Sequence, residues 1–467
     1  MESQVVQMTK QLMFNIFTMN TVSHVNQGMW RHPENKTVDH NDLGTWIELA
    51  ELAERGMFDT IFLADGAGLG GDFGGDWKIY PERGLMFPIA DPMMLLPAMV
   101  HATDNLGFIV TSAPIQHPPY SFARSMATLD HLSTGRIGWN VVTNASANAH
   151  RNVGLDGLVE HDERYSIAEE YLEVVYKLWE GSWDDDAILR DVDRGIYADP
   201  SRVHKINHEG KYFRSEGPLQ VAPSPQRTPM LFQAGGSDVG RNFGARHAEG
   251  IFIMADTPAD AARVIEDMRA RADAAGRNAD DLRFFQGLTF VVGSTMEEAE
   301  RKAAELDKYQ DPTASMAYRG GFMGIDFASA DPDTPLRELI KQADGVKGPL
   351  QLFIDKQPEG SNPTVRDLSA FFGAKYRVVG TPESISDELA EWAAVGVDGI
   401  NMISIITPGT YSEFIDFVVP VLQERGLMKR EYAPGTLREK FYGAGHSRLE
   451  LPHPAAQQRT HPTLSGK

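Results

Sequence analysis

Eight apolar runs typical of β-strands alternate with eight stretches of helical period along this chain of 467 residues. Such alternation favours a mainly parallel sheet, because neighbouring parallel strands are joined by helix-length crossovers. The predicted strands, each given with the helix that follows it, are Gln11–Met19 and Asp42–Arg55, Phe58–Asp65 and Pro92–Thr103, Leu106–Ala113 and Tyr120–Leu132, Arg136–Thr143 and Asp162–Glu180, Pro229–Gly235 and Ser237–Ala248, Gly250–Ala255 and Pro258–Ala275, Arg283–Val292 and Met296–Leu306, and Gly399–Ile406 and Tyr411–Arg425. Eight units fit a closed (β/α)8 TIM barrel better than an open doubly wound sheet of about six strands. We therefore predict an α/β protein of the TIM-barrel class.

Three long segments interrupt this pattern, and an extended arm follows it. The segments span residues 66–90, 182–227 and 312–377, and the arm spans residues 427–467. Loops of this length are uncommon unless they close a site, bind a ligand or serve assembly. We interpret the chain, 1–467, as a single barrel domain whose insertions border the C-terminal mouth, where such barrels bind ligands.

The amino-acid composition indicates which kinds of partner and which kinds of site the protein can have. The chain has 65 acidic and 44 basic residues, a formal net charge of -21, whereas a nucleic-acid-binding surface needs a basic stripe. It has no cysteine, which excludes disulfides, thiolate metal sites and cysteine nucleophiles. No apolar run reaches the roughly 18 residues of a membrane span, and the first residues lack the pattern of a secretory signal. We expect a cytoplasmic protein that binds neither nucleic acid nor a membrane.

Polar residues stand where several predicted strands end, which is where a parallel barrel presents groups to a ligand. Asp65 ends the second predicted strand, and Asn140 lies near the end of the fourth. His161 and Tyr165 are four residues apart at the start of the next helix and so share a face. A helix or loop cap remains an alternative for Asp65, and simple packing remains one for the His161–Tyr165 pair.

Two glycine-rich segments invite a search for phosphate-binding loops. In Gln233-Ala-Gly-Gly-Ser237 an apolar strand runs into glycines and then a serine suited to cap the following helix, so exposed amides there could cradle a phosphate. A capping role alone explains Ser237 equally well. Gly66-Ala-Gly-Leu-Gly-Gly71 matches the dinucleotide pattern G-x-G-x-x-G, but no helical sequence follows, which favours a loop over the barrel mouth. The chain has no H-E-x-x-H metal motif, and we predict no metal site.

Several short motifs together carry a family resemblance. They are Gly28–His32, Glu54–Asp59 with Ala64–Asp65, Leu129–Ser133 with Gly135–Arg136, Trp139–Thr143, His161–Tyr165, Lys211–Phe213, Gln233–Gly235 and Val419–Gln423. In these motifs the chain resembles the bacterial-luciferase-like flavin monooxygenases, in the branch acting on nitrilotriacetate, dibenzothiophene sulfone and dimethyl sulfide. The motifs run almost end to end in consistent order, which makes the resemblance more specific than any single motif.

The resemblance implies a TIM-barrel enzyme, the large oxygenase component of a two-component monooxygenase. Such an enzyme takes reduced FMN (FMNH2) from a separate NAD(P)H-dependent flavin reductase and uses O2 to oxygenate a small organic substrate. The implied cofactor-binding residues are Gly235, Gly236, Ser237, His161 and Tyr165 for the phosphate, and Asp65, Thr111, Ser112 and Asn140 for the ring edge. His24 and His32, which follow the first strand, are the catalytic candidates near the reacting oxygen. We also expect a homodimer or homotetramer.

The substrate is less constrained than the cofactor. Val22–His24, Lys177–Trp183, Pro223–Pro229 and His453–Gln457 look closest to the dimethyl sulfide subgroup, which implies a small organosulfur compound. An aminopolycarboxylate, an N-heterocycle or a halogenated aromatic stays open as substrate. Three alternatives lie outside this class: a non-catalytic flavin-binding barrel, a deazaflavin-dependent dehydrogenase and a metal-dependent barrel hydrolase. The last is disfavoured because no His-x-His pair follows the first strand.

Overall fold

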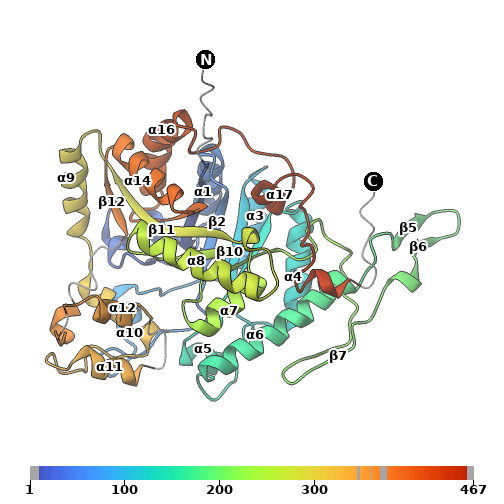
Figure 1. Cartoon of the computed structure of the whole chain (residues 1–467), viewed down its shortest axis with the longest axis horizontal. Helices are drawn as coiled ribbons and strands as arrows, with labels where there is room; N and C mark the ends of the chain where they lie inside the picture. The colour runs from blue at the N-terminus through green and yellow to red at the C-terminus, as the bar shows by residue number, and fades with distance from the viewer. Residues whose placement is uncertain (1–9, 344–347, 359, 369–375, 460–467) are drawn as a thin grey trace.

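A closed barrel of eight parallel strands forms the centre of the computed structural model, which describes residues 10–343, 348–358, 360–368 and 376–459 (Figure 1). The barrel strands are β1 (Met13–Met19), β2 (Thr60–Ala64), β3 (Gly107–Ser112), β4 (Ile137–Val141), β9 (Met230–Gln233), β10 (Gly250–Ile253), β11 (Arg283–Val292) and β13 (Gly399–Ile403). They pair in chain order, and β13 pairs with β1 to close the ring. Each strand falls within a range that the sequence predicts, and the TIM barrel is confirmed.

Helices follow the strands and cover the outside of the barrel. They are α1 (Leu43–Arg55), α3 (Leu96–His101), α4 (Pro119–Leu132), α6 (His161–Tyr176), α7 (Asp238–His247), α8 (Pro258–Ala274), α9 (Met296–Asp307), α14 (Pro382–Ala394), α15 (Gly409–Glu413) and α16 (Val419–Glu424). The first of these shows why they form: α1 is capped by Asp42 and buries Trp46, Leu49 and Ala53, the three-to-four-residue spacing of one helix face. Two π-helical turns, η4 (Lys177–Gly181) and η8 (Phe414–Val418), adjoin α6 and α16.

The barrel interior is filled with aromatic side chains. Phe62, Phe232 and Phe285 are fully buried there, and Phe232 and Phe285 pack against Phe441 with ring centroids 6.3 and 5.9 Å apart. Phe441 belongs to α17 (Leu437–Tyr442), a short helix of the C-terminal arm. Because side chains fill the barrel, ligand binding is left to the ends of the strands.

The region before the last barrel strand differs from the sequence-based prediction. The sequence pattern predicts no element between the insertion 312–377 and that strand at 399, whereas the structure places β12 (Arg377–Gly380) and α14 there. β12 pairs in parallel with residues Thr289–Val292, the second half of the ten-residue β11. It therefore extends the sheet outside the closed ring. The predicted helix Pro92–Thr103 is also shorter, because it divides into a 3-10 turn, η3 (Pro92–Met94), and α3.

The three long segments have secondary structure of their own. Segment 66–90 contains α2 (Ile79–Arg83), and α5 (Ala147–Asn152) follows β4 nearby. Segment 182–227 forms the hairpins β5 (Ile188–Asp191) with β6 (Ile196–Ala198) and β7 (His208–Glu209) with β8 (Arg214–Ser215). Segment 312–377 contains α10 (Pro312–Met323), α11 (Leu336–Gln342) and α12 (Gly348–Asp355).

Figure 1 shows β5 and β6 projecting from the body at the right, and α10, α11 and α12 gathered at the lower left, whereas α17 lies at the upper edge. Short 3-10 turns complete the elements: η1 (Met29–Arg31), η2 (Lys36–Asp39), η5 (Pro200–Arg202), η6 (Ala279–Asp281), η7 (Val365–Asp367) and η9 (Ala456–Gln458). Residues 344–347, 359 and 369–375 of the third segment and 460–467 of the arm lie outside the described residues. No helix in the described part of the chain has the length and apolar character needed to cross a membrane.

Candidate functional site

Two predicted ring-edge residues, Thr111 and Asn140, are hydrogen-bonded neighbours at the ends of β3 and β4. They face each other in the strand register, and the Asn140 side-chain Nδ2 donates to the Thr111 Oγ1 at 3.0 Å. Both are buried, yet the Asn140 Oδ1 accepts no hydrogen bond from any described residue. A buried amide oxygen without a donor is costly, so an N–H group of a ligand would complete this pair. Ser112 is also buried, and its carbonyl accepts from the Trp139 indole at 3.0 Å.

Asp65 follows β2 directly and is held by a residue that the sequence reasoning missed. The Gln116 side-chain Nε2 donates to the Asp65 Oδ2 at 3.0 Å, and the Gln116 Oε1 accepts from the Ala113 backbone N–H. Burial raises the pKa of the Asp65 carboxyl to about 6, and hydrogen bonds from Gln116 and the Gly66 N–H oppose this rise. Gln116 lies in the loop after β3, and no motif in the sequence singles it out.

The predicted phosphate-binding residues meet at the start of α7. Ser237 caps this helix, and its Oγ accepts from the Gly240 N–H at 3.1 Å. The Tyr165 hydroxyl is hydrogen-bonded to the side chains of Ser237 and Thr143, while burial raises the pKa of Tyr165. A Cβ at Gly240 would lie 2.5 Å from that hydroxyl oxygen, so glycine is needed for its close approach.

Gly235 and Gly236 differ in their surroundings. A Cβ at Gly235 would lie 2.2 Å from the Gln233 Nε2, whereas a Cβ at Gly236 would meet nothing within 4 Å. The backbone before Ser237 is therefore packed on one side and open beside Gly236. Unpaired N–H groups and the helix dipole make such a helix start suited to an anion.

His161 lies at the edge of this group. Its side chain is 39% exposed, its Nδ1 lies 2.7 Å from the Asp162 carboxylate, and its ring contacts Tyr165 with centroids 5.4 Å apart. Arg164, from the same motif, is buried and donates to the Asn144 carbonyl oxygen at 2.5 Å. The sequence reasoning quoted this motif but assigned Arg164 no role.

The two catalytic candidates have different environments. The half-buried His24 ring packs on Phe17, whose side chain adjoins the barrel interior, with centroids 4.8 Å apart. Burial lowers the pKa of His24 to about 4, so the imidazole is neutral at pH 7. His32 packs instead against Tyr309, and its Nδ1 accepts from the Glu34 N–H at 3.3 Å. Neither of these two contacts joins His32 to the predicted flavin-binding groups.

The glycine-rich loop after β2 is pinned on one side by α5. The Leu69 N–H donates to the Asn148 Oδ1 at 3.0 Å, and the Leu69 carbonyl accepts from the Ser146 hydroxyl. A Cβ at Gly68 would lie 2.5 Å from the backbone nitrogen of Ala149. The loop backbone therefore lies directly against α5, an approach that a larger residue at 68 would prevent.

The same loop is held on its other side by the third segment. A Cβ at Gly70 would lie 3.1 Å from the Gly321 Cα of α10. The Asp326 carboxylate accepts from the N–H groups of Gly74 and Gly75 at 2.8 and 2.9 Å. The loop thus joins α5 to the helices of the third segment and forms a bridge between them.

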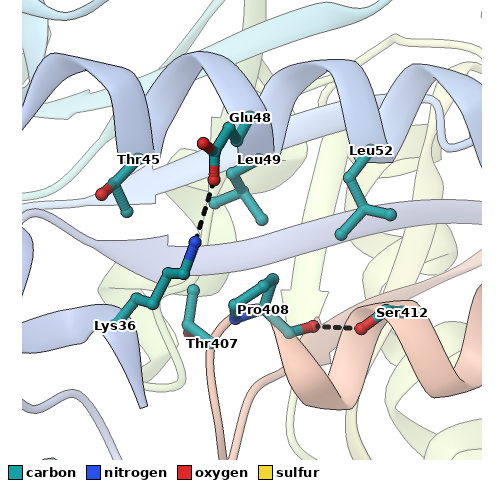
Figure 2. Close-up of a pocket in the computed structure, with 8 residues that line it drawn as sticks. All are labelled: Lys36, Thr45, Glu48, Leu49, Leu52, Thr407, Pro408 and Ser412. Carbon is teal, nitrogen blue, oxygen red and sulfur yellow. Dashed lines mark hydrogen bonds and ion pairs between the residues drawn. The ribbon is translucent and has the colours of Figure 1, made fainter. Parts of the chain in front are cut away.

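One surface cleft lies away from these residues. A cavity of about 240 Å³ lies between η2, α1 and the start of α15, where Lys36 pairs with Glu48 at 3.0 Å (Figure 2). Its walls are formed by Lys36, Thr45, Glu48, Leu49, Leu52, Thr407, Pro408 and Ser412. It contains none of the predicted site residues. Among the described residues, no three His, Asp or Glu side chains are grouped so as to hold a metal ion.

Comparison with known proteins connects this geometry to a family. The family model for luciferase-like monooxygenases matches residues 13–399. The dimethyl-sulfide monooxygenase of Hyphomicrobium sulfonivorans is 42% identical over 97% of this chain and 94% of its own length. The long-chain alkane monooxygenase of Geobacillus thermodenitrificans is 41% identical over 97% of this chain and 99% of its own length.

Solved structures agree with these matches. The crystal structure of long-chain alkane monooxygenase superimposes with a TM-score of 0.89 over 97% of this chain and all of that one. A riboflavin lyase, crystallised with modified FMN and riboflavin, superimposes with a TM-score of 0.90 at 39% identity, over 97% of this chain and 100% of its own. The barrel and the monooxygenase class predicted from sequence are both confirmed. The chain belongs to the luciferase-like monooxygenase family.

Proposed function

We propose that this protein is the oxygenase component of a two-component monooxygenase, which uses reduced FMN and O2 to oxygenate a small apolar organosulfur compound such as dimethyl sulfide. Similarity to dimethyl-sulfide monooxygenase along nearly the whole chain supports the substrate class. The observation that carries the cofactor site is the unsatisfied Asn140 Oδ1 at the barrel mouth, together with the α7 start that Ser237 caps. These supply one partner for a flat polar ring and one for a phosphate.

The residues present fit FMN in chemistry as well as in placement. The isoalloxazine ring carries N–H and carbonyl groups along one edge, and Asn140 offers a free acceptor beside the Thr111 hydroxyl. The phosphate is an anion, and the open backbone at Gly236 leads into the N-terminus of a ten-residue helix. Tyr165 and Ser237 place two hydroxyl groups at that same point.

Bound reduced flavin supplies the activation of O2, which no side chain in this site can perform. The protein's part is to bind, orient and exclude water. Ser237 and the α7 amides hold the phosphate, while Asp65 and Asn140 orient the ring edge. His24, a neutral imidazole at pH 7, can donate or accept one hydrogen bond beside the reacting centre. The bridge of residues 66–75 and α10 keeps water from the mouth.

A separate flavin reductase completes the system. The chain's one G-x-G-x-x-G segment lies in a loop held against α5 and α10 and opens no helix, so it offers no nicotinamide-binding unit. One relative, 35% identical, is named nitrilotriacetate monooxygenase component A, which supports an enzyme of separate components. The oxygenase itself would assemble as a homodimer or homotetramer.

A second substrate class is supported by similarity at nearly the same level. Long-chain alkane monooxygenase is 41% identical over 97% of this chain, and alkanes share the apolar character of dimethyl sulfide. Aminopolycarboxylates have weaker support, from one relative at 35% identity. Both leading classes are uncharged, so we expect a dry, apolar substrate space beside the flavin.

The test combines binding with turnover. Anaerobic and aerobic titrations should show weak binding of oxidised FMN and tighter binding of the reduced form, and O2 uptake with a flavin reductase should rise when substrate is added. A screen of dialkyl sulfides against n-alkanes of increasing length would then rank the two classes. Tight binding of oxidised FAD, or flavin binding without any substrate-dependent O2 uptake, would contradict the proposal and favour a non-catalytic flavin carrier.

A further inference from the structure

Asp65 is the one acidic side chain among the predicted flavin-binding residues, and its surroundings fix it in place. It follows β2 and is half-buried. Gln116 donates to its Oδ2 at 3.0 Å while the Gln116 Oε1 is itself engaged by the Ala113 N–H. Because both ends of the Gln116 amide are bonded, the amide cannot turn to offer its oxygen to Asp65. The carboxyl is therefore presented in one orientation beside the end of β3.

A carboxylate held in this way can accept hydrogen bonds but cannot donate them. Reduction of the flavin ring adds a hydrogen-bond donor, which is the partner that such an acceptor requires. Its N1 and N5 atoms are acceptors in the oxidised ring, and N5 becomes an N–H donor in the reduced ring. An acceptor fixed beside N5 would thus gain a partner on reduction and face a like lone pair on oxidation.

Resting on the flavin site proposed above, we infer that Asp65, oriented by Gln116, is the group by which this protein selects reduced over oxidised FMN. Asp65 would be the specificity-determining residue, because its carboxylate would lie beside the flavin N5. Gln116 acts through Asp65 and is a positioning residue. A protein that must collect reduced flavin from a reductase, and release it after oxidation, needs such a discriminating group.

The charge of Asp65 makes the selection dependent on pH. Burial raises the pKa of Asp65 to about 6, the charge of Asp91 adds to this, and the Gln116 and Gly66 hydrogen bonds oppose it. Asp91 faces Asp65 from the start of η3, where its Oδ1 accepts from the Met93 N–H at 2.8 Å. Above a pH of about 6 the carboxyl group is ionised and can only accept hydrogen bonds. Below it the protonated carboxyl can also donate, and it no longer disfavours the oxidised ring.

The experiment measures the ratio of dissociation constants for oxidised and reduced FMN in the full-length protein between pH 5 and pH 8. Fluorescence quenching gives the oxidised value, and anaerobic calorimetry gives the reduced one. In the wild type the ratio should fall by about tenfold from pH 8 to pH 5, the effect of one charge-assisted hydrogen bond. In Asp65→Asn it should be about tenfold smaller at pH 8 and nearly independent of pH. Because free reduced FMN also titrates, the quantity compared is wild type against variant at each pH.

Gln116→Leu provides a second variant that keeps the carboxyl. Loss of the donor should raise the pH at which the ratio changes, because the ionised form of Asp65 is then less stabilised. Asp91→Asn should lower the pH at which the ratio changes, since this substitution removes a negative charge that faces Asp65.

An unchanged ratio in folded Asp65→Asn would overturn the inference, as would an unshifted midpoint in folded Gln116→Leu. If the wild type bound neither form of FMN, the proposed function would fall and the inference with it. If the wild type oxygenated substrate but showed a ratio near one, the inference alone would fall.

Discussion

At the scale of single residues, the predicted flavin site divides into groups that the structure brings together and groups that it leaves apart. Thr111 and Asn140 are hydrogen-bonded, and Tyr165 meets Ser237 at the start of α7. Strand ends and a helix cap are local features, so a sequence can reveal them. Gln116 could not be found this way, because its role depends on a contact with Asp65 across 51 positions of the chain.

Ser237 has two roles that one pair of variants can separate. Ser237→Ala should weaken FMN binding by about 1–2 kcal/mol through the lost phosphate hydrogen bond, and should lower the free energy of unfolding by about 1 kcal/mol through the lost cap. Thr257→Ala is the matched control, since Thr257 caps α8 in the same manner, accepting from Asp260 N–H at 3.1 Å. It should lose stability alone. Calorimetric titration with FMN and with riboflavin measures the difference; equal losses for both ligands would reduce Ser237 to a cap.

His24 should make the protein less stable in mild acid. Its pKa is about 4 in the folded protein and about 6.5 when unfolded, so the unfolded chain binds more protons between these values. The free energy of unfolding is therefore unaffected by this group above pH 7 and falls as the pH drops through 6.5 towards 4. Relative to His24→Gln, the wild type should lose about 1–2 kcal/mol between pH 8 and pH 5. Urea unfolding at both pH values measures this, and a constant difference would show that His24 titrates normally.

At the scale of elements, hydrophobic periodicity located the barrel strands but not every element between them. Buried parallel strands read as continuous apolar runs, and all eight were found. β12 was missed because it is four residues long and only half of its residues are buried, so it has too little pattern to recognise. The glycines after β2 also have a packing role that the sequence pattern did not indicate. Gly68 and Gly70 are needed for close packing against α5 and α10.

The proposed role of the bridge in excluding water can be tested with two glycines of the same loop. Gly68→Ala would place a Cβ 2.5 Å from the Ala149 backbone nitrogen, so the loop must lift from α5. Gly71→Ala is the control, because its nearest neighbour would be the Gly321 Cα at an ordinary 3.7 Å. We expect Gly68→Ala to release more hydrogen peroxide per oxygenated product, since water then reaches the flavin, while Gly71→Ala behaves as wild type. Peroxide and product are measured together, and equal coupling in both variants would mean that water is excluded elsewhere.

At the scale of the whole molecule, the C-terminal arm is bound to the barrel by buried charges. Arg438 pairs with Glu249 through two hydrogen bonds of 2.6 and 3.0 Å, and both side chains are almost fully buried. Arg459 reaches the buried Glu180 at 2.7 Å, on the π-helical turn after α6. The sequence indicated an extended arm after the last barrel helix, docking on the body or on a neighbour. It could not show which acidic residues receive it, since these partners lie 189 or more positions away in the chain.

Removing one partner of the inner pair should destabilise the whole fold. Arg438→Met leaves Glu249 buried without its cation, and we expect the free energy of unfolding to fall by about 3–5 kcal/mol. Arg448→Met is the control, because Arg448 pairs with Asp185 at 2.6 Å near the surface and should contribute less than about 1 kcal/mol. Urea unfolding followed by tryptophan fluorescence compares the two. Similar losses of unfolding free energy would show that the buried Arg438–Glu249 pair contributes no more than the Arg448–Asp185 pair.

The aromatic side chains inside the barrel and the α17 helix at its far end limit where reactants can enter and leave. Because Phe441 and its neighbours fill that end, flavin, oxygen, substrate and product would all enter and leave at the C-terminal ends of the strands. If the proposed function holds, spent flavin is exchanged for reduced flavin in every cycle, and residues 66–75, held between α5 and the third segment, follow β2 at that same end. The turnover rate would accordingly follow how quickly the bridge lets flavin out, rather than how quickly oxygen is transferred.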